Sequence, residues 1–215
     1  MSTTRFEARR PGLSRRAIAE AALELVDTEG VERLTVRALA ARLNSGAMSL
    51  YRHVPSREAI VADVVGLLLD EIEVPDRPGV TWGEGAKLVG RSLRAMALRH
   101  PKAFELVAAA PSDRPPLVGF AGRLRRFYLS RGVPADAFEE VWSILDAFET
   151  GFLLLETQSL IRAEAGLMAD MEELSPETLE LAARMPRTLG EAAYEEGMAI
   201  IIAGLARRFS APSLR

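Results

Sequence analysis

Residues 33–57 constrain the fold of this chain most, because two short helical patterns lie on either side of a tight turn. Apolar residues recur at helical spacing around the turn at residues 44–46: Val36, Leu39, Ala40 and Leu43 precede it, and Ala47, Leu50, Tyr51 and Val54 follow it. Two helices that each pack through one face across such a turn are typical of a helix-turn-helix. The segment therefore predicts a compact pair of helices with one face left for contact with another molecule.

The same segment is strongly basic, with five arginines and no carboxylate. Residues 1–60 contain 10 Lys or Arg against 7 Asp or Glu, whereas residues 61–215 contain 17 against 23, so a part of net charge +3 precedes a part of net charge −6. We expect only the basic part to contact nucleic acid, because phosphate groups repel the acidic remainder. The alternative is that the arginines merely solvate this face and that Tyr51 lies in the core.

The composition favours an all-α fold throughout. Aromatic residues make up only 6% of the chain, and good helix formers such as Ala, Leu, Glu and Arg dominate it. Two prolines and a glycine interrupt the periodicity at residues 73–80, so we expect a helix-turn-helix domain at residues 1–72, the head, and a larger helical bundle at residues 73–215, the body. In the body we expect helices at residues 82–100, 101–110, 117–131, 135–165 and 189–209, and a short one after residue 175.

The sequence also disfavours several classes of function. It has no cysteine and only two histidines, so we expect no metal and no cofactor. Neither a leader segment nor an apolar stretch long enough to span a membrane is present, which predicts a cytoplasmic protein with no membrane partner. No nucleophile–base pair or phosphate loop is present, so an enzyme using Asp146 and Glu149 is only a weak alternative.

Residues 34–54, followed by PSREAIVADV, resemble the TetR family of bacterial transcriptional regulators, and LYRHV at residues 50–54 is the most diagnostic piece. In the body, LRHP at residues 98–101, RGVP at 131–134 and FETGFLLLE at 148–156 resemble the tetracycline-repressor subgroup. The resemblance implies a homodimer with two DNA-binding heads, and a body that binds a ligand and dimerises. Asn44 and Ser45 replace the Gly-Val usual in the turn. Because Asn tolerates a left-handed backbone, we expect the turn to persist with weaker local packing.

The candidate DNA contacts combine family position with side-chain chemistry. Bases are read at groove edges, whereas phosphate contacts fix the register of the protein on the duplex. We expect base-edge contacts from Ala47, Met48, Ser49 and His53. We expect phosphate contacts from Thr35, Arg37, Tyr51, Arg52 and Arg57, and a further DNA contact from Arg15.

Large apolar side chains gather on the body helices that the family places around a ligand cavity, although a plain core is the alternative. The expected lining is Met96, Phe104, Phe120, Leu124, Phe127, Trp142, Leu145, Phe148 and Phe152. Asp146 and Glu149 lie three residues apart on one apolar helix, so we expect one of them, Glu149 in our assignment, to face the cavity. A solvent-facing pair is the alternative. The expected ligand is a small, mainly apolar effector.

His100 lies where tetracycline-binding members of the family use a histidine to hold a metal. Its neighbours Pro101, Lys102 and Ala103 offer no side-chain oxygen, so we expect no metal–tetracycline site. We expect His100 to end a helix and to donate or accept a hydrogen bond in the cavity.

Dimerisation is expected through the helices at 135–165 and 189–209, which correspond to the family's pairing helices. The expected interface stripe is Tyr194, Met198, Ile201, Ile202 and Leu205, although periodicity does not separate an interface from a helix buried in its own chain. The sequence thus predicts a DNA-binding transcriptional regulator. We expect it to be a repressor that binds operator DNA and is released from it by a small effector. The alternative is a ligand-independent, dimeric DNA-binding protein whose body only dimerises.

Overall fold

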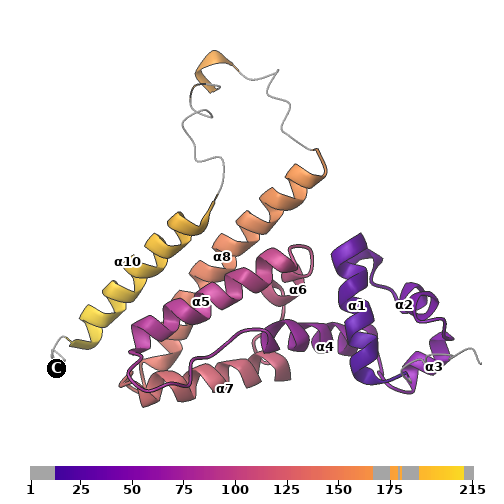
Figure 1. Cartoon of the computed structure of the whole chain (residues 1–215), viewed down its shortest axis with the longest axis horizontal. Coiled ribbons are helices and arrows are strands. Elements are labelled where there is room, and N and C mark those ends of the chain that lie inside the picture. Colours follow the sequence, from indigo (N-terminus) through magenta and orange to yellow (C-terminus); the bar gives the residue numbers. More distant parts are fainter. Residues whose placement is uncertain (1–12, 167–174, 179, 181–188, 211–215) are drawn as a thin grey trace, which may run out of the picture.

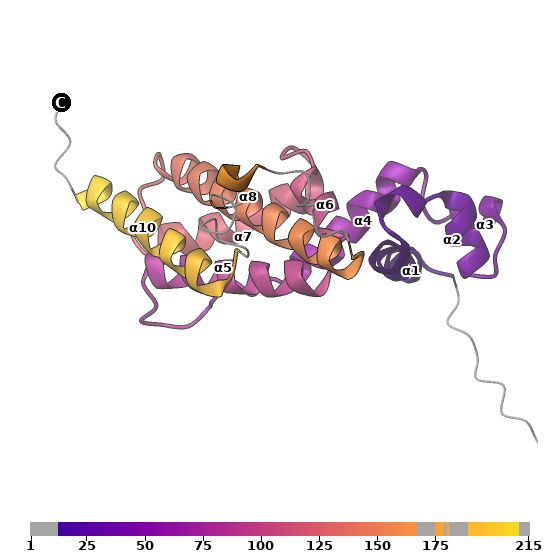
Figure 2. The same ribbon diagram turned by 90° about the horizontal axis from the view of Figure 1, so that it is seen from above.

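A computed structural model of the chain describes residues 13–166, 175–178, 180 and 189–210. In this part of the chain every regular element is a helix, which confirms the predicted all-α class. The head lies at one end of an elongated molecule and the body occupies the rest (Figures 1 and 2). No helix within the described ranges combines the length and the apolar composition that a membrane span requires.

The head consists of α1 (Arg15–Glu29), η1 (Val31–Arg33), α2 (Val36–Arg42), α3 (Ala47–Tyr51) and α4 (Arg57–Asp70). The side chains of Ser14, Thr35 and Ser56 cap α1, α2 and α4, because they accept hydrogen bonds from backbone N–H groups in the first turns of these helices. The buried stripe of α1 packs against α4 and α2 and forms the core of the head.

Helix α4 joins the head to the body. Its buried side chains contact α1 on the head side, and the same helix packs against α6 and α7 of the body. In Figure 1 it runs from α1 toward the helices of the body. A change in the packing of the body around α4 is therefore transmitted to the head through one continuous helix.

The body consists of α5 (Trp82–Arg99), α6 (Phe104–Ala108), α7 (Pro115–Ser130), α8 (Phe138–Glu164) and α10 (Glu191–Ser210). Thr81 and Glu84 form a capping box at the start of α5. Helix α8 begins three residues later than predicted, because the N–H of Ala137 donates to the carbonyl of Pro134 in a separate turn. Helices α8 and α10 lie side by side, and α5 packs against both (Figure 1).

Candidate functional site

The turn of the helix-turn-helix adopts the left-handed backbone expected at Asn44, whose φ is 48°. The N–H groups of Asn44 and Ser45 donate to the carbonyls of Ala41 and Ala40 at 3.1 and 2.9 Å, so the end of α2 is closed by hydrogen bonds. Gly46 then begins α3 in an extended conformation. The replacement of the usual Gly-Val pair therefore leaves the turn intact, as predicted.

The reading helix α3 is shorter than the sequence pattern indicated. It spans only Ala47–Tyr51, and Arg52 and His53 lie in the turn that follows. Leu50 and Val54 are buried, whereas Ala47 and Tyr51 are exposed although they share the apolar spacing, so the alternative that Tyr51 lies in the core is not observed. Ala47 is the first residue of this short helix and Tyr51 is the last. Met48, at 76% exposure, is the most prominent apolar side chain of this surface.

The remaining candidate DNA contacts surround α3, and several already have partners in the protein. The Thr35 hydroxyl caps α2, the Arg57 Nε–H donates to the carbonyl of Leu34 at 2.8 Å, and Arg37 is exposed. Arg15 donates two hydrogen bonds to Asp63, at 2.7 and 2.9 Å, which neutralises part of its charge. Contact of these residues with DNA stays a prediction.

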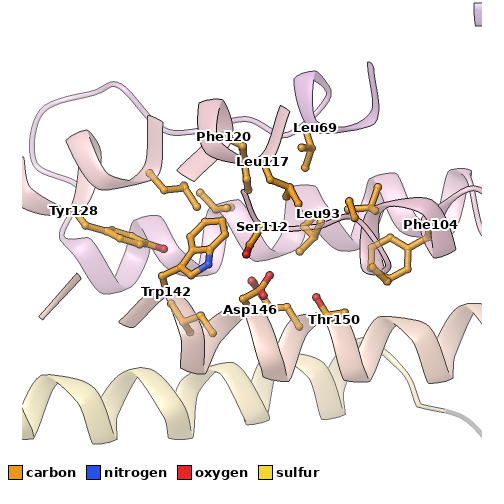
Figure 3. A pocket seen from close by; sticks show the side chains of 17 residues that line it. Leu69, Leu93, Phe104, Ser112, Leu117, Phe120, Tyr128, Trp142, Asp146 and Thr150 are labelled. Atoms are coloured by element: carbon orange, nitrogen blue, oxygen red, sulfur yellow. The ribbon is translucent and has the colours of Figure 1, made fainter. Parts of the chain in front are cut away.

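An internal cavity of about 120 Å³ lies between α4, α5, the α6–α7 segment and α8 (Figure 3). Six of the expected residues line it: Phe104, Phe120, Leu124, Trp142, Leu145 and Glu149. Sequence reasoning missed Leu69, Ser112, Tyr128 and Thr150 among the lining residues. Helical spacing could have found Thr150, four residues after Asp146, and Tyr128, four residues after Leu124. No sequence signal pointed to Leu69, because it comes from the head's last helix.

Five other expected lining residues lie outside this cavity. Met96 is fully buried in the core, and Phe127 packs so closely on Gly85 that a Cβ there would lie 2.1 Å from the ring. Phe148 and Phe152 stack around Tyr194, with ring centroids 5.9 and 5.3 Å away. These rings fill the space between α5, α8 and α10, so the expectation that they line the cavity is not met. The fifth residue, His100, is described below.

One wall of the cavity is polar. Asp146 and Thr150 project from α8 toward Ser112 on the opposite side (Figure 3), and Glu149 also lines the cavity. Burial raises the pKa of Glu149 to about 8, so this carboxyl is largely protonated at neutral pH. Burial raises the pKa of Asp146 as well. Glu149 is buried at the cavity, as expected, whereas Asp146 lines the cavity and is also exposed to solvent.

Glu149 belongs to a buried hydrogen-bond network with α5 and α10. The Tyr194 hydroxyl lies 3.0 Å from the carbonyl of Gly90 and 3.1 Å from Oε1 of Glu149. A phenol has one hydrogen to donate, so a protonated Glu149 completes the network by donating to Tyr194 while Tyr194 donates to Gly90. Next to this network, Arg94 of α5 donates two hydrogen bonds to the buried carboxylate of Glu156 at 3.0 and 2.7 Å. These contacts hold the polar wall of the cavity in place.

His100 ends α5, as predicted, but points away from the cavity toward the head. Its Nδ1 lies 2.7 Å from Oδ2 of Asp27 in α1, and its Nε2 lies 3.3 Å from Oε1 of Glu71 at the end of α4. Lys102 Nζ donates to the carbonyl of Thr28 at 2.9 Å. The end of α5 thus binds both head helices that meet the body. Within the described residues, no cluster of three or more potential ligands could hold a metal ion.

The expected dimer stripe on α10 faces the chain's own core. Tyr194, Met198, Ile202 and Leu205 are buried against α5 and α8, and Ile201 is half-buried. A partner chain cannot contact the four side chains that are already buried. For these four, the alternative holds that this face of α10 packs within its own chain. The apolar side chains that α8 and α10 leave exposed are different ones: Ile144, Leu155, Leu160 and Ile200.

Comparison with known proteins decides the family. The family model for bacterial regulatory proteins of the tetR family matches residues 18–64, and the model for the tetracyclin repressor-like C-terminal domain matches residues 74–209. The chain belongs to the TetR family. Proteins of this family are bacterial regulatory proteins. The first match ends inside α4, and the second begins within the proline-rich segment at residues 73–80.

Several relatives share this TetR architecture. The repressor DrrR1 of Streptomyces coeruleorubidus is 32% identical over 107 residues, which cover 47% of this chain and 38% of DrrR1, so the chain matches well under half of that protein's length. The matched stretch also covers only 45% of an HTH-type regulator of Saccharopolyspora erythraea. An uncharacterized HTH-type regulator of Mycobacterium tuberculosis is 31% identical over 84% of this chain and 85% of its own. The TetR-family protein ActR of Streptomyces coelicolor, solved with actinorhodin, is 29% identical with a TM-score of 0.73, covering 94% of this chain and all of that one.

Proposed function

We propose that this TetR-family regulator is a repressor that binds operator DNA through α3 and leaves it when a small, mainly apolar effector enters the internal cavity. The observation that carries the proposal is the position of Leu69. This side chain lines the cavity, and it lies on α4, whose other buried residues belong to the core that α4 shares with α1. A ligand that displaces Leu69 therefore moves the helix on which the head is built.

The size of the cavity supports a switch. Ligand pockets for drug-sized molecules enclose about 300–1,000 Å³, whereas the cavity of about 120 Å³ is comparable to one that holds a single benzene ring. A larger effector enters only if a wall moves, so it binds more tightly to a conformer with an expanded body. Differential affinity for two conformers is what allows a ligand to shift their equilibrium. ActR with bound actinorhodin and the repressor DrrR1 are relatives whose names agree with such a function.

The proposal assigns DNA contact to the exposed surface around α3. Ala47, Met48, Ser49 and His53 are placed at base edges. Thr35, Arg37, Tyr51 and Arg52 are placed at phosphates. All eight side chains lie in residues 33–57, which contain no carboxylate; seven of them are exposed and Ser49 is half-buried. The positive charge of this surface attracts the phosphate groups of DNA whatever the base sequence.

The proposal also includes a homodimer. Ile144, Ala147, Gly151 and Leu155 are exposed along one stripe of α8, and Ile200 is exposed on the neighbouring α10, where Leu155 and Ile200 reach 59% and 62% exposure. Small residues between large apolar ones allow close helix packing, so a second copy is the natural cover for this face. Two heads related by a two-fold axis would then reach successive major-groove half-sites about 34–36 Å apart.

Substitution of Arg52 tests the DNA interface. We expect Arg52→Ala to weaken binding about tenfold on any duplex and to reduce the slope of log affinity against log salt by about 1, because it removes one phosphate contact. Ser49→Ala is expected to act on sequence preference instead, narrowing the ratio of operator to non-specific affinity. Fluorescence anisotropy on an operator selected from a random DNA pool measures both.

The matched control for these two variants is Arg162→Ala, which removes an exposed arginine from α8 in the body. It leaves the affinity and the salt slope unchanged if the head alone contacts DNA. Equal losses for Arg52→Ala and Arg162→Ala would contradict the proposed interface.

A further inference from the structure

A second hollow lies where the head meets the body. It is a groove of about 500 Å³ between the first half of α4 and the segment that joins α6 to α7. Its floor is apolar and includes Val61, Val65 and Leu106. Pro115 and Pro116, the first residues of α7, form a rigid wall.

The groove and the internal cavity share two lining residues, Ala110 and Leu117. Both side chains are half-buried; Ala110 follows α6 and Leu117 lies in the first turn of α7. They form the partition between the groove and the internal cavity. Movement of Leu117 would join the two spaces into one site whose volume falls in the range typical of ligand pockets.

The charges around the groove favour an anion. Arg15, Arg57 and Arg114 line it. Arg15 is paired with Asp63, and Arg114 forms only a long, exposed ion pair with Asp113 at 3.9 Å. Among the described residues no carboxylate accepts a hydrogen bond from Arg57 or Arg114. Glu58, the only acid in the lining, is held at the start of α4 by its own N–H and by the Ser56 hydroxyl, which lower its pKa.

We propose that this groove binds the anionic end of an amphipathic organic acid, whose apolar part passes between Ala110 and Leu117 into the internal cavity. Guanidinium groups of Arg57 on the head and Arg114 on the body hold the acid through charge-assisted hydrogen bonds. The inference rests on the proposed function and names the chemical class of the effector. It also gives the effector a direct route to DNA release, because the acid occupies Arg57, a candidate phosphate contact, and ties α4 to α7.

A pair of fluorescent probes tests this site. The anion 8-anilinonaphthalene-1-sulfonate and the neutral N-phenyl-1-naphthylamine share one aromatic body, and only the first carries a sulfonate. We expect the wild-type protein to bind the anion more tightly, and Arg114→Gln to weaken that binding about tenfold while changing the affinity for the neutral probe less than twofold. Leu117→Trp, which fills the partition, should weaken the binding of both probes.

The matched control is Arg126→Gln, an exposed arginine of the same helix that does not line the groove. It should leave both affinities unchanged. Equal affinities of the wild-type protein for the two probes, or equal effects of the two arginine variants, would overturn the proposed site. Operator affinity of Arg114→Gln is measured separately. If Arg114→Gln loses affinity for the anionic probe but keeps its affinity for the operator, the result supports the site. If both probes behave as expected but the protein binds no operator, the regulator proposal fails and the proposed site stands.

Discussion

Replacement of Arg94 by methionine is expected to lower the free energy of unfolding of the body by about 3 kcal/mol, because it leaves a buried carboxylate without a partner. Glu156 is only 6% exposed, and both of its carboxylate oxygens accept from Arg94. Urea unfolding followed by tryptophan emission measures this loss, since both tryptophans, Trp82 and Trp142, lie in the body.

Two further variants control this prediction. Arg91 lies on the same helix and pairs with Glu195, but its side chain is 56% exposed, so Arg91→Met should cost less than about 1 kcal/mol. The double variant Arg94→Met with Glu156→Leu removes both charges and should recover most of the stability lost by Arg94→Met alone. Equal losses for the two arginine variants would show that the Arg94 pair is not effectively buried.

Glu149→Gln is expected to raise the free energy of unfolding by about 3 kcal/mol at pH 7. Burial raises the pKa of Glu149 to about 8 in the folded chain, whereas 4.5 is the ordinary value. Between these two values the folded state binds a proton that the unfolded state has released. The wild-type protein therefore loses stability as pH rises from about 4.5 to 8, and the glutamine variant lacks this loss. The difference between the two proteins vanishes near pH 4.5 and levels off above pH 8.

Glu195→Gln is a control of opposite sign. The hydrogen bond from Arg91 lowers the pKa of Glu195, so the ionised carboxylate stabilises the fold near neutral pH and that stability is lost as pH falls through the folded-state pKa. Its replacement should slightly lower stability at pH 7. Urea unfolding at a series of pH values distinguishes the two variants, and a Glu149→Gln profile parallel to that of the wild-type protein would show that Glu149 is ionised in the fold.

The head could be predicted closely from the sequence because its determinants are local. Ser14, Thr35 and Ser56 cap helices through hydrogen bonds to residues three positions away, and Asn44 takes the left-handed backbone that its side chain tolerates. The pattern failed only at the end of α3. There the helical spacing continues to Val54, although the backbone leaves the helix after Tyr51.

The body was harder to predict because its site depends on which helices meet. Phe120 and Phe127 lie on one helix and look alike in sequence, yet Phe120 lines the cavity and Phe127 fills the space above Gly85. The stripe around Tyr194 has the same period whether it faces a partner or its own chain. Likewise, contact of His100 with Asp27 joins residues 73 positions apart, which no local pattern reveals.

The most direct test of the regulator proposal is the affinity of the purified protein for DNA from immediately upstream of its own coding region. Fluorescence anisotropy compares that fragment with a scrambled duplex of equal length across a salt series. We predict that at physiological salt the native fragment binds at least about 1,000-fold more tightly than the scrambled one. Equal affinities with the same steep salt dependence would mean that the head only attracts phosphate, and would contradict the assignment of α3 as a reading helix for this DNA.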